Sequence, residues 1–409
     1  MSYFRVSLFA AFLAGGGIPL YVHLPLYATD VLGLSLSTLA IVLVVIRLID
    51  TVQDPLLGRL ADRFGANRPL LAAVAVLGLS LGFLLLFTLR PDTPTGAWLL
   101  AVLVLVFTAY SFATILFYGR GVELASGGGP DRHYRLAGFR ETGTLVGILV
   151  AVSLPQVGSG AGMDGYAILG LTLAGLGVVM LVANRGLWPP QVKTNEARFK
   201  LSDLRDADAT PVLILALVNA LPVAITSTLF LFFVEDKLQL PDYAGHFLLL
   251  FFLCAGLSAP IWSRLSQRFG AKRVLLPAMV LAIVSFIGAA SLAPGSAMAF
   301  AVISAASGAA LGADMVILPA LFSVQLERGN VSTGVAFGIW AFVAKLALAM
   351  AAGITLPLLD FAGFEPGQTN SAQALTTLTW AYAVVPCILK LCAIWMVVRL
   401  PETPLATTK

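Results

Sequence analysis

The chain has 409 residues, of which 59% are hydrophobic and 11% are charged, and its formal net charge is +4. Soluble domains carry about 25% charged residues, so this composition excludes an ordinary soluble protein. The basic residues are scattered along the chain, which argues against a nucleic-acid-binding surface. The three cysteines fall in apolar stretches, and their odd number argues against a disulfide framework.

Twelve apolar stretches are long enough to cross a bilayer, which takes about 20 residues. We predict transmembrane helices over residues 6–28, 36–58, 69–89, 97–118, 137–158, 165–187, 210–234, 243–264, 273–293, 297–323, 333–358 and 374–398. The first stretch is longer than the apolar core of a signal peptide and has no small-residue cleavage site, so we expect an uncleaved helix. The remaining segments are too short for an extramembrane domain.

The distribution of charge predicts the orientation in the membrane. With the N-terminus in the cytoplasm, most Lys and Arg residues fall on the cytoplasmic side, whereas Asp30, Asp92 and Asp164 fall on the other. This is the positive-inside pattern with both termini cytoplasmic. We therefore expect a multi-pass protein of the plasma (inner) membrane, and a monomer.

An internal repeat divides the twelve predicted helices into six and six. Residues 59–71 read RLADRFGANRPLL and residues 264–276 read RLSQRFGAKRVLL, identical at nine of thirteen positions. Repeats in the same membrane orientation, related by a pseudo-two-fold axis, are typical of secondary transporters. We predict an all-α membrane protein with an N-terminal bundle (1–187), a central cytoplasmic loop (188–209) and a C-terminal bundle (210–409).

The turn after the second predicted helix carries a recognisable motif. Residues 58–65 read GRLADRFG, which resembles a signature of the major facilitator superfamily. The glycines permit a tight turn, and Asp62 and Arg63 can form charge pairs that break when the two halves rock. The alternative is a solvated charged loop that only obeys the positive-inside rule.

Charges at membrane depth are costly, so each is a functional hypothesis. Asp50 and Asp54 lie one helical turn apart, and Arg47 lies on the same face of the predicted helix over residues 36–58. Two carboxylates so close either share a proton or bind a cation. The alternative is that Arg47 merely neutralises Asp50.

These residues also carry a narrower resemblance. Residues 29–35 read TDVLGLS and residues 47–58 read RLIDTVQDPLLG, which resemble the glycoside-pentoside-hexuronide:cation symporter family, the family of the melibiose carrier. The resemblance implies that Asp50 and Asp54 bind the coupling cation (Na⁺, H⁺ or Li⁺). It implies that Gln53 is a polar neighbour and Ser111 a hydroxyl ligand from the helix over 97–118.

The resemblance does not extend to the sugar site. The family's sugar-holding aspartates fall on Ala14 and Thr114, so we expect the substrate not to be a typical galactoside. Arg140 falls on the family's substrate-contacting arginine and Lys345 on its lysine in the eleventh helix. The candidate substrate-binding residues, aromatic, hydroxyl or cationic, are Tyr21, Tyr110, Thr114, Tyr118, Arg140, Trp340 and Lys345. For the aromatic residues, ordinary helix packing is the alternative.

Four further charges fall within predicted helices. We expect Asp314 and Lys345 to form a pair that breaks when substrate enters, because an unpaired charge there is costly. Glu141 points about 100° away from Arg140 on an ideal helix, and either helix packing or a proton path would account for it. Lys390 has no assigned partner.

No motif of a metalloprotease, a phosphate-binding loop or a redox cysteine pair is present, so we predict a transporter rather than an enzyme. The prediction is a cation-coupled symporter of a small organic solute, with no cofactor other than its coupling Na⁺ or H⁺. A cavity with aromatic walls and positive charge leaves a lysolipid or other amphipathic or organic-anion transporter as an alternative. A proton-coupled exporter is the other alternative. The expected partners are the substrate and the lipid bilayer.

Overall fold

The computed structural model describes residues 3–17, 20, 24, 27–89, 95–160, 164–190 and 200–400. Within these residues every regular element is a helix. The long helices are α1 (Tyr3–Gly17), α4 (Leu36–Arg63), α5 (Arg68–Thr88), α6 (Thr95–Ala125), α7 (Pro130–Gly160), α8 (Gly165–Ala183), α10 (Ala209–Phe232), α11 (Ala244–Phe269), α12 (Ala271–Ile287), α13 (Ala297–Arg328), α14 (Thr333–Phe361) and α16 (Val385–Arg399). The shorter ones include α9 (Leu201–Asp206), α15 (Ala372–Thr379) and a π-helical turn, η7 (Trp380–Val384).

Each predicted membrane span overlaps an observed helix, and the last is built from α15, η7 and α16 in succession. Among the described residues, nine helices are long and apolar enough to cross a membrane. The all-helical architecture of a multi-pass membrane protein is therefore confirmed. The main difference lies at helix ends, since α4 continues past residue 58 to Arg63 and α7 begins at Pro130 rather than at residue 137.

Local sequence explains where several helices begin. The Ser35 hydroxyl accepts a hydrogen bond from the Thr38 N–H at the start of α4. The Asp164 carboxylate accepts the N–H groups of Tyr166 and Ala167 at the start of α8. Such caps satisfy backbone donors that the first turn of a helix leaves unpaired.

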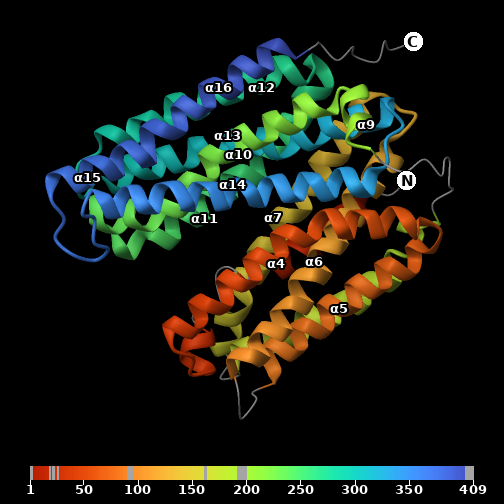
Figure 1. The fold of residues 1–409 in the computed structure, drawn as a ribbon, viewed down its shortest axis with the longest axis horizontal. Helices are drawn as coiled ribbons and strands as arrows, with labels where there is room; N and C mark the ends of the chain where they lie inside the picture. Colours follow the sequence, from red (N-terminus) through yellow and green to blue (C-terminus); the bar gives the residue numbers. More distant parts are fainter. Residues whose placement is uncertain are drawn as a thin grey trace. The chain divides into compact units, whose positions relative to one another are not determined.

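The chain forms two compact units. The first consists of residues 1–125, 139–203 and 330–342, and the second of residues 126–138, 204–329 and 343–409. In the first unit α6 packs against α4 and α5, and α5 also packs against α8 (Figure 1). In the second unit α13 packs against α11 and α12, and α16 packs against α10 and α12 (Figure 1).

Small residues bring α11 and α13 into close contact. A Cβ atom built on Gly312 would clash with the Ala255 carbonyl oxygen, and Gly308 approaches the Phe251 carbonyl in the same way. Close backbone approach at glycine is a common means of helix association in membranes. Asp314 lies two residues beyond Gly312, next to this close contact between α11 and α13.

Candidate functional site

Helix α4 has one exposed aliphatic face and one buried polar face. Its most exposed large side chains are aliphatic and repeat every three to four residues: Ile41, Val44, Leu48, Val52 and Leu56, all at least 57% exposed. Asp50 and Asp54 are 1% and 0% exposed. Since residues four apart share a helix face, both carboxylates point into the first unit, away from the aliphatic face.

Asp50 is the centre of a polar cluster between α4 and α6. Its Oδ1 atom accepts hydrogen bonds from Gln53 Nε2 and from Ser111 Oγ, each at 3.1 Å. The Thr108 hydroxyl donates to Gln53 Oε1 at 2.8 Å. The structure thus brings Gln53 and Ser111, which the family resemblance implied, to Asp50, and it adds Thr108, which the resemblance did not imply. Thr108 lies three residues before Ser111 on α6, so the helical period could have revealed it.

Asp54 lies at a close approach of α4 and α14. A Cβ atom built on Gly338 would be 2.5 Å from the Asp54 carbonyl oxygen, so only glycine fits at that position without a shift. Two buried carboxylates one turn apart, beside amide and hydroxyl oxygens, provide hard ligands of the kind that alkali cations bind. The same pair can instead share a proton.

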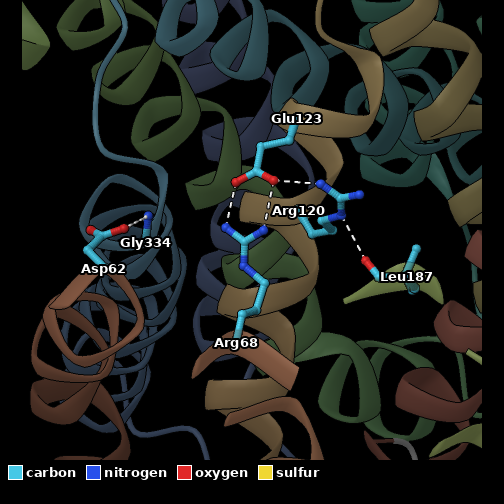
Figure 2. A network of polar contacts seen from close by, with 6 residues as sticks. All are labelled: Asp62, Arg68, Arg120, Glu123, Leu187 and Gly334. Atoms are coloured by element: carbon cyan, nitrogen blue, oxygen red, sulfur yellow. Dashed lines mark hydrogen bonds and ion pairs between the residues drawn. The ribbon is translucent and has the colours of Figure 1, made fainter. Parts of the chain in front are cut away.

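The end of α4 interacts with the beginning of α14. Asp62 Oδ1 accepts the Gly334 N–H at 2.9 Å, and Oδ2 accepts the Val335 N–H at 2.7 Å. Figure 2 shows the Asp62 side chain pointing at Gly334. A carboxylate here satisfies two unpaired donors and lies at the positive end of the helix dipole. Gly58 makes the approach possible, because a Cβ there would clash with the Gly334 carbonyl.

A second polar network lies in the same unit (Figure 2). Arg68 at the start of α5 makes a bidentate contact with Glu123 near the end of α6, at 2.7 and 2.5 Å. Arg120 donates to Glu123 at 2.6 Å and to the Leu187 carbonyl at 2.7 Å. From the sequence, these two arginines contributed only to the positive-inside pattern that predicts the orientation in the membrane. The forked Arg68–Glu123 contact, together with Arg120, therefore connects the start of α5, the end of α6 and the segment around Leu187.

Arg47 and Arg63, the two arginines for which the sequence predicted charge pairs, differ in their surroundings. The Arg47 guanidinium lies 6.0 Å from the centre of the Phe107 ring on α6, and Arg47 is half-buried. Arg63 is exposed, and its guanidinium lies 5.6 Å from the centre of the Phe64 ring. Arg47 is therefore partly shielded from the surroundings of the first unit, whereas Arg63 lies on the surface of that unit.

Arg140 and Tyr118, two of the candidate substrate-binding residues, are in contact. The Arg140 guanidinium is 4.1 Å from the centre of the Tyr118 ring, and Arg140 is 5% exposed. Its Nε donates to Glu141 Oε1 at 2.8 Å. The expectation that Glu141 points away from Arg140 is wrong, because two long side chains on adjacent positions can bend toward each other. The tyrosine face and the carboxylate together compensate a buried positive charge.

The remaining substrate candidates are only partly brought together. Thr114 donates to the Tyr110 carbonyl at 2.8 Å on α6, and Trp340 is half-buried in the first unit. Lys345 belongs to the second unit. Tyr21 lies outside the described residues.

Asp314 has a different partner from the one predicted. Its Oδ2 atom forms an ion pair at 2.5 Å with Lys390 Nζ of α16, not with Lys345. Lys390 Nζ also donates to Asn219 Oδ1 of α10 at 2.7 Å. The error arose because sequence spacing identifies residues on one face of a helix but not which helices become neighbours. The sequence assigned no partner to Lys390, and the structure pairs it with Asp314 and Asn219.

The all-helical architecture, with buried polar side chains between the helices, is that of a multi-pass membrane protein. Residues 5–403 match the model of the family described as "MFS/sugar transport protein". The chain therefore belongs to that family.

The relatives and the fold agree with this assignment. An uncharacterized symporter YnaJ of Bacillus subtilis is 24% identical over 91% of this chain and 85% of its own. An isoprimeverose transporter of Lactiplantibacillus pentosus is 23% identical over 90% and 81%. The mouse sphingosine-1-phosphate transporter MFSD2B is 27% identical, over 40% of this chain and 34% of its own. The crystal structure of a bacterial homologue of the iron transporter ferroportin, in an outward-facing state, matches with a TM-score of 0.65 and 14% identity, covering 96% and 99%.

Proposed function

We propose that this secondary transporter is a symporter that couples the movement of a cation, Na⁺ or H⁺, to that of an organic solute. Asp50 and Asp54 bind the cation. Gln53 and Ser111 complete the site by holding the Asp50 carboxylate and by supplying neutral oxygen ligands. The single observation that carries the proposal is the burial of both carboxylates on the polar face of α4, with Asp50 bonded to α6.

The cation acts by removing a repulsion. Two ionised carboxylates one turn apart in a low-dielectric interior destabilise the empty site, and a cation between them relieves that cost. Because Ser111 is on α6 and Gly338 of α14 lies against Asp54, occupancy of the site changes how firmly α4 is held by two other helices. Coupling follows if the cation binds one arrangement of these helices more tightly than another.

The substrate we favour is an organic solute with anionic or amphipathic character. Ala14 and Thr114 replace the carboxylates expected in a galactoside site, and the buried Arg140 beside Tyr118 provides a cation with an aromatic wall. One relative is named an isoprimeverose transporter and another a sphingosine-1-phosphate transporter. The substrates in these two names therefore differ widely in chemistry. This preference rests on the absence of those carboxylates and on the buried contact between Arg140 and Tyr118.

The test is the thermal stability of the purified chain in detergent, in Na⁺, Li⁺ or K⁺ and over a range of pH, because a ligand of the native state raises apparent stability. We expect Na⁺ or Li⁺ to raise the melting temperature of the wild type and to have no effect on Asp50→Asn or Asp54→Asn. Asp360→Asn, at an exposed position of α14, is the matched control and should respond like the wild type. Stabilisation by acid alone, lost in the same two variants, would identify a proton as the coupling ion. An equal ion response in all four proteins would refute the proposed site.

A further inference from the structure

A row of polar side chains connects α4 and α6 in the first unit. Asp50 and Gln53 are three residues apart on α4, and Thr108 and Ser111 are three residues apart on α6, so each pair shares a helix face. Gln53 and Ser111 both donate to Asp50 Oδ1. Thr108 donates to Gln53, and it is the one member of the row to which the proposed cation site gives no role.

The chemistry of the row fixes the direction of each hydrogen bond. An ionised Asp50 carboxylate only accepts hydrogen bonds, so the Gln53 amide must turn its NH₂ group toward Asp50. The carbonyl oxygen of the same amide then faces Thr108, whose hydroxyl must be the donor. With the amide reversed, two acceptor oxygens would face each other where Gln53 Nε2 now lies 3.1 Å from Asp50 Oδ1. Thr108 therefore holds the amide in the orientation that suits Asp50.

Thr108 uses its hydroxyl differently from other threonines of this chain. A threonine inside a helix can always reach the backbone carbonyl four residues earlier, and that bond requires no neighbouring helix. Several threonines of the described helices make this bond: Thr51, Thr88, Thr114, Thr228 and Thr355. Thr108 instead donates to a side chain of another helix, at 2.8 Å. Its hydroxyl thus serves the contact between α4 and α6.

The orientation of the amide matters because it holds the Asp50 carboxylate. Asp50 Oδ1 accepts one hydrogen bond from Gln53 on its own helix and one from Ser111 on α6, so rotation of the carboxylate away from this position breaks both. A ligand held by hydrogen bonds from a second layer of residues presents its oxygens to a cation at fixed positions. Selectivity between cations of different size depends on how rigidly such ligands are held.

We propose that Thr108 is a positioning residue of the cation site, which acts through Gln53 to set the affinity for Na⁺ and the discrimination between Na⁺ and Li⁺. This assignment rests on the proposed cation site at Asp50 and Asp54. The Thr108 hydroxyl holds the amide, the amide and Ser111 hold the Asp50 carboxylate, and the carboxylate receives the cation. Without the hydroxyl the amide is free to turn, so the site binds Na⁺ more weakly and distinguishes it less from Li⁺.

The test is equilibrium binding of radioactive sodium to the purified full chain in detergent, with unlabelled Li⁺ as competitor and choline chloride to keep the ionic strength constant. Thr108→Val keeps the shape of the side chain and removes its hydrogen bond. We expect the Kd for Na⁺ to rise about two- to tenfold, which is the range that the loss of one hydrogen bond gives. We also expect the ratio of the Kd values for Na⁺ and Li⁺ to move toward one.

Three further variants distinguish positioning from a general loss of stability. Thr108→Ser retains the hydroxyl and should bind both ions like the wild type. Thr88→Val, in the same unit, removes a hydroxyl that donates to the Leu84 carbonyl of its own helix, and it should also bind like the wild type. In a Gln53→Leu background, Thr108→Val should change neither Kd further, because the amide through which Thr108 acts is already absent.

The assignment and the proposed function fail in different ways. Wild-type binding of Na⁺ by Thr108→Val, a raised Kd with an unchanged ratio between the two ions, or weak binding by Thr108→Ser would overturn the role of Thr108 and leave the cation site standing. A further loss on adding Thr108→Val to Gln53→Leu would do the same, because Thr108 would then act without the amide. Absence of Na⁺ binding to the wild type would instead refute the sodium form of the proposed function, and this assignment with it.

Discussion

Asp62 of α4 accepts a hydrogen bond from the backbone N–H of Gly334 at 2.9 Å, and the same carboxylate caps the first turn of α14 through the Val335 N–H. Two turns earlier on α4, Asp54 is the residue against which Gly338 of α14 packs. The proposed cation site and the cap are therefore two points of contact between the same pair of helices. We therefore expect a substitution at the cap to alter cation binding, and a substitution at the cation site to alter the stability of the cap.

Removing the cap should destabilise the protein. Asp62→Ala leaves the N–H groups of Gly334 and Val335 without their acceptor and removes a favourable charge from the helix terminus, which together cost about 1–3 kcal/mol. The melting temperature in detergent measures this. Arg63→Gln, on the neighbouring exposed side chain, should have almost no effect, and equal losses in the two variants would show that the cap is not the cause.

The contact at Gly338 should tolerate no side chain. Gly338→Val places atoms against the Asp54 carbonyl, and we expect a loss of about 1–3 kcal/mol together with a weaker response to the coupling ion. Gly353→Val is the matched control on the same helix, because no atom of the described residues lies within 4 Å of a Cβ built there. If both substitutions behave alike, helix propensity rather than the contact explains the result.

Asp314 and Lys390 should show strong coupling in stability. Lys390→Met alone leaves a buried carboxylate unpaired and should cost about 3–5 kcal/mol, whereas adding Asp314→Leu should recover most of that loss. A double-mutant cycle followed by thermal melting gives the coupling energy. The same cycle with Lys345→Met in place of Lys390→Met should give a value near zero. A larger coupling with Lys345 would restore the pairing that the sequence alone suggested.

His133 predicts a pH dependence of stability. It precedes the predicted span 137–158 and pairs with Glu327 at 2.5 Å, and burial lowers the pKa of His133 below its ordinary value, partly offset by Glu327. A histidine with a lower pKa in the folded state binds a proton more weakly there than in the unfolded chain. Stability should therefore fall as the pH drops through about 6.5.

The matched variant for that prediction is His133→Gln, which retains a hydrogen-bond donor for Glu327 but cannot titrate. Its melting temperature should fall less than that of the wild type between neutral and mildly acidic pH. A steeper fall in the variant would mean that protonated His133 stabilises the pair, opposite to the effect expected from its lowered pKa.

Transport offers a separate prediction for Asp54. Asp54→Asn should abolish uptake driven by an ion gradient, because the substituted site no longer gains energy from the cation, while the protein remains folded. Uptake into proteoliposomes with and without an imposed Na⁺ or H⁺ gradient measures it. Undiminished uphill accumulation in the variant would exclude Asp54 as the coupling residue.

Much of this architecture follows from the sequence because membrane helices obey strong local rules. A run of about 20 apolar residues specifies a span without reference to the rest of the fold. The i, i+4 spacing of Asp50 and Asp54 likewise specifies their common face, and the structure brings Gln53 and Ser111 to Asp50.

Contacts between helices far apart in the sequence could not be predicted in this way. Lys390 is 76 residues from Asp314, and only the packing of α13, α12 and α16 brings them together. The proximity of Glu141 to Arg140 depends on side-chain conformation, which helix periodicity does not describe. Gly334 became recognisable as part of the Asp62 site only once the start of α14 was known.

The most direct test of the central claim is equilibrium binding of radioactive sodium to the purified wild type, Asp54→Asn and Asp360→Asn, at two pH values. We expect saturable sodium binding to the wild type and to Asp360→Asn, weakened at the lower pH by competing protons, and none to Asp54→Asn. If the wild type takes up no sodium and the Asp54→Asn variant takes up as many protons as the wild type on acidification, Asp50 and Asp54 do not form the coupling site.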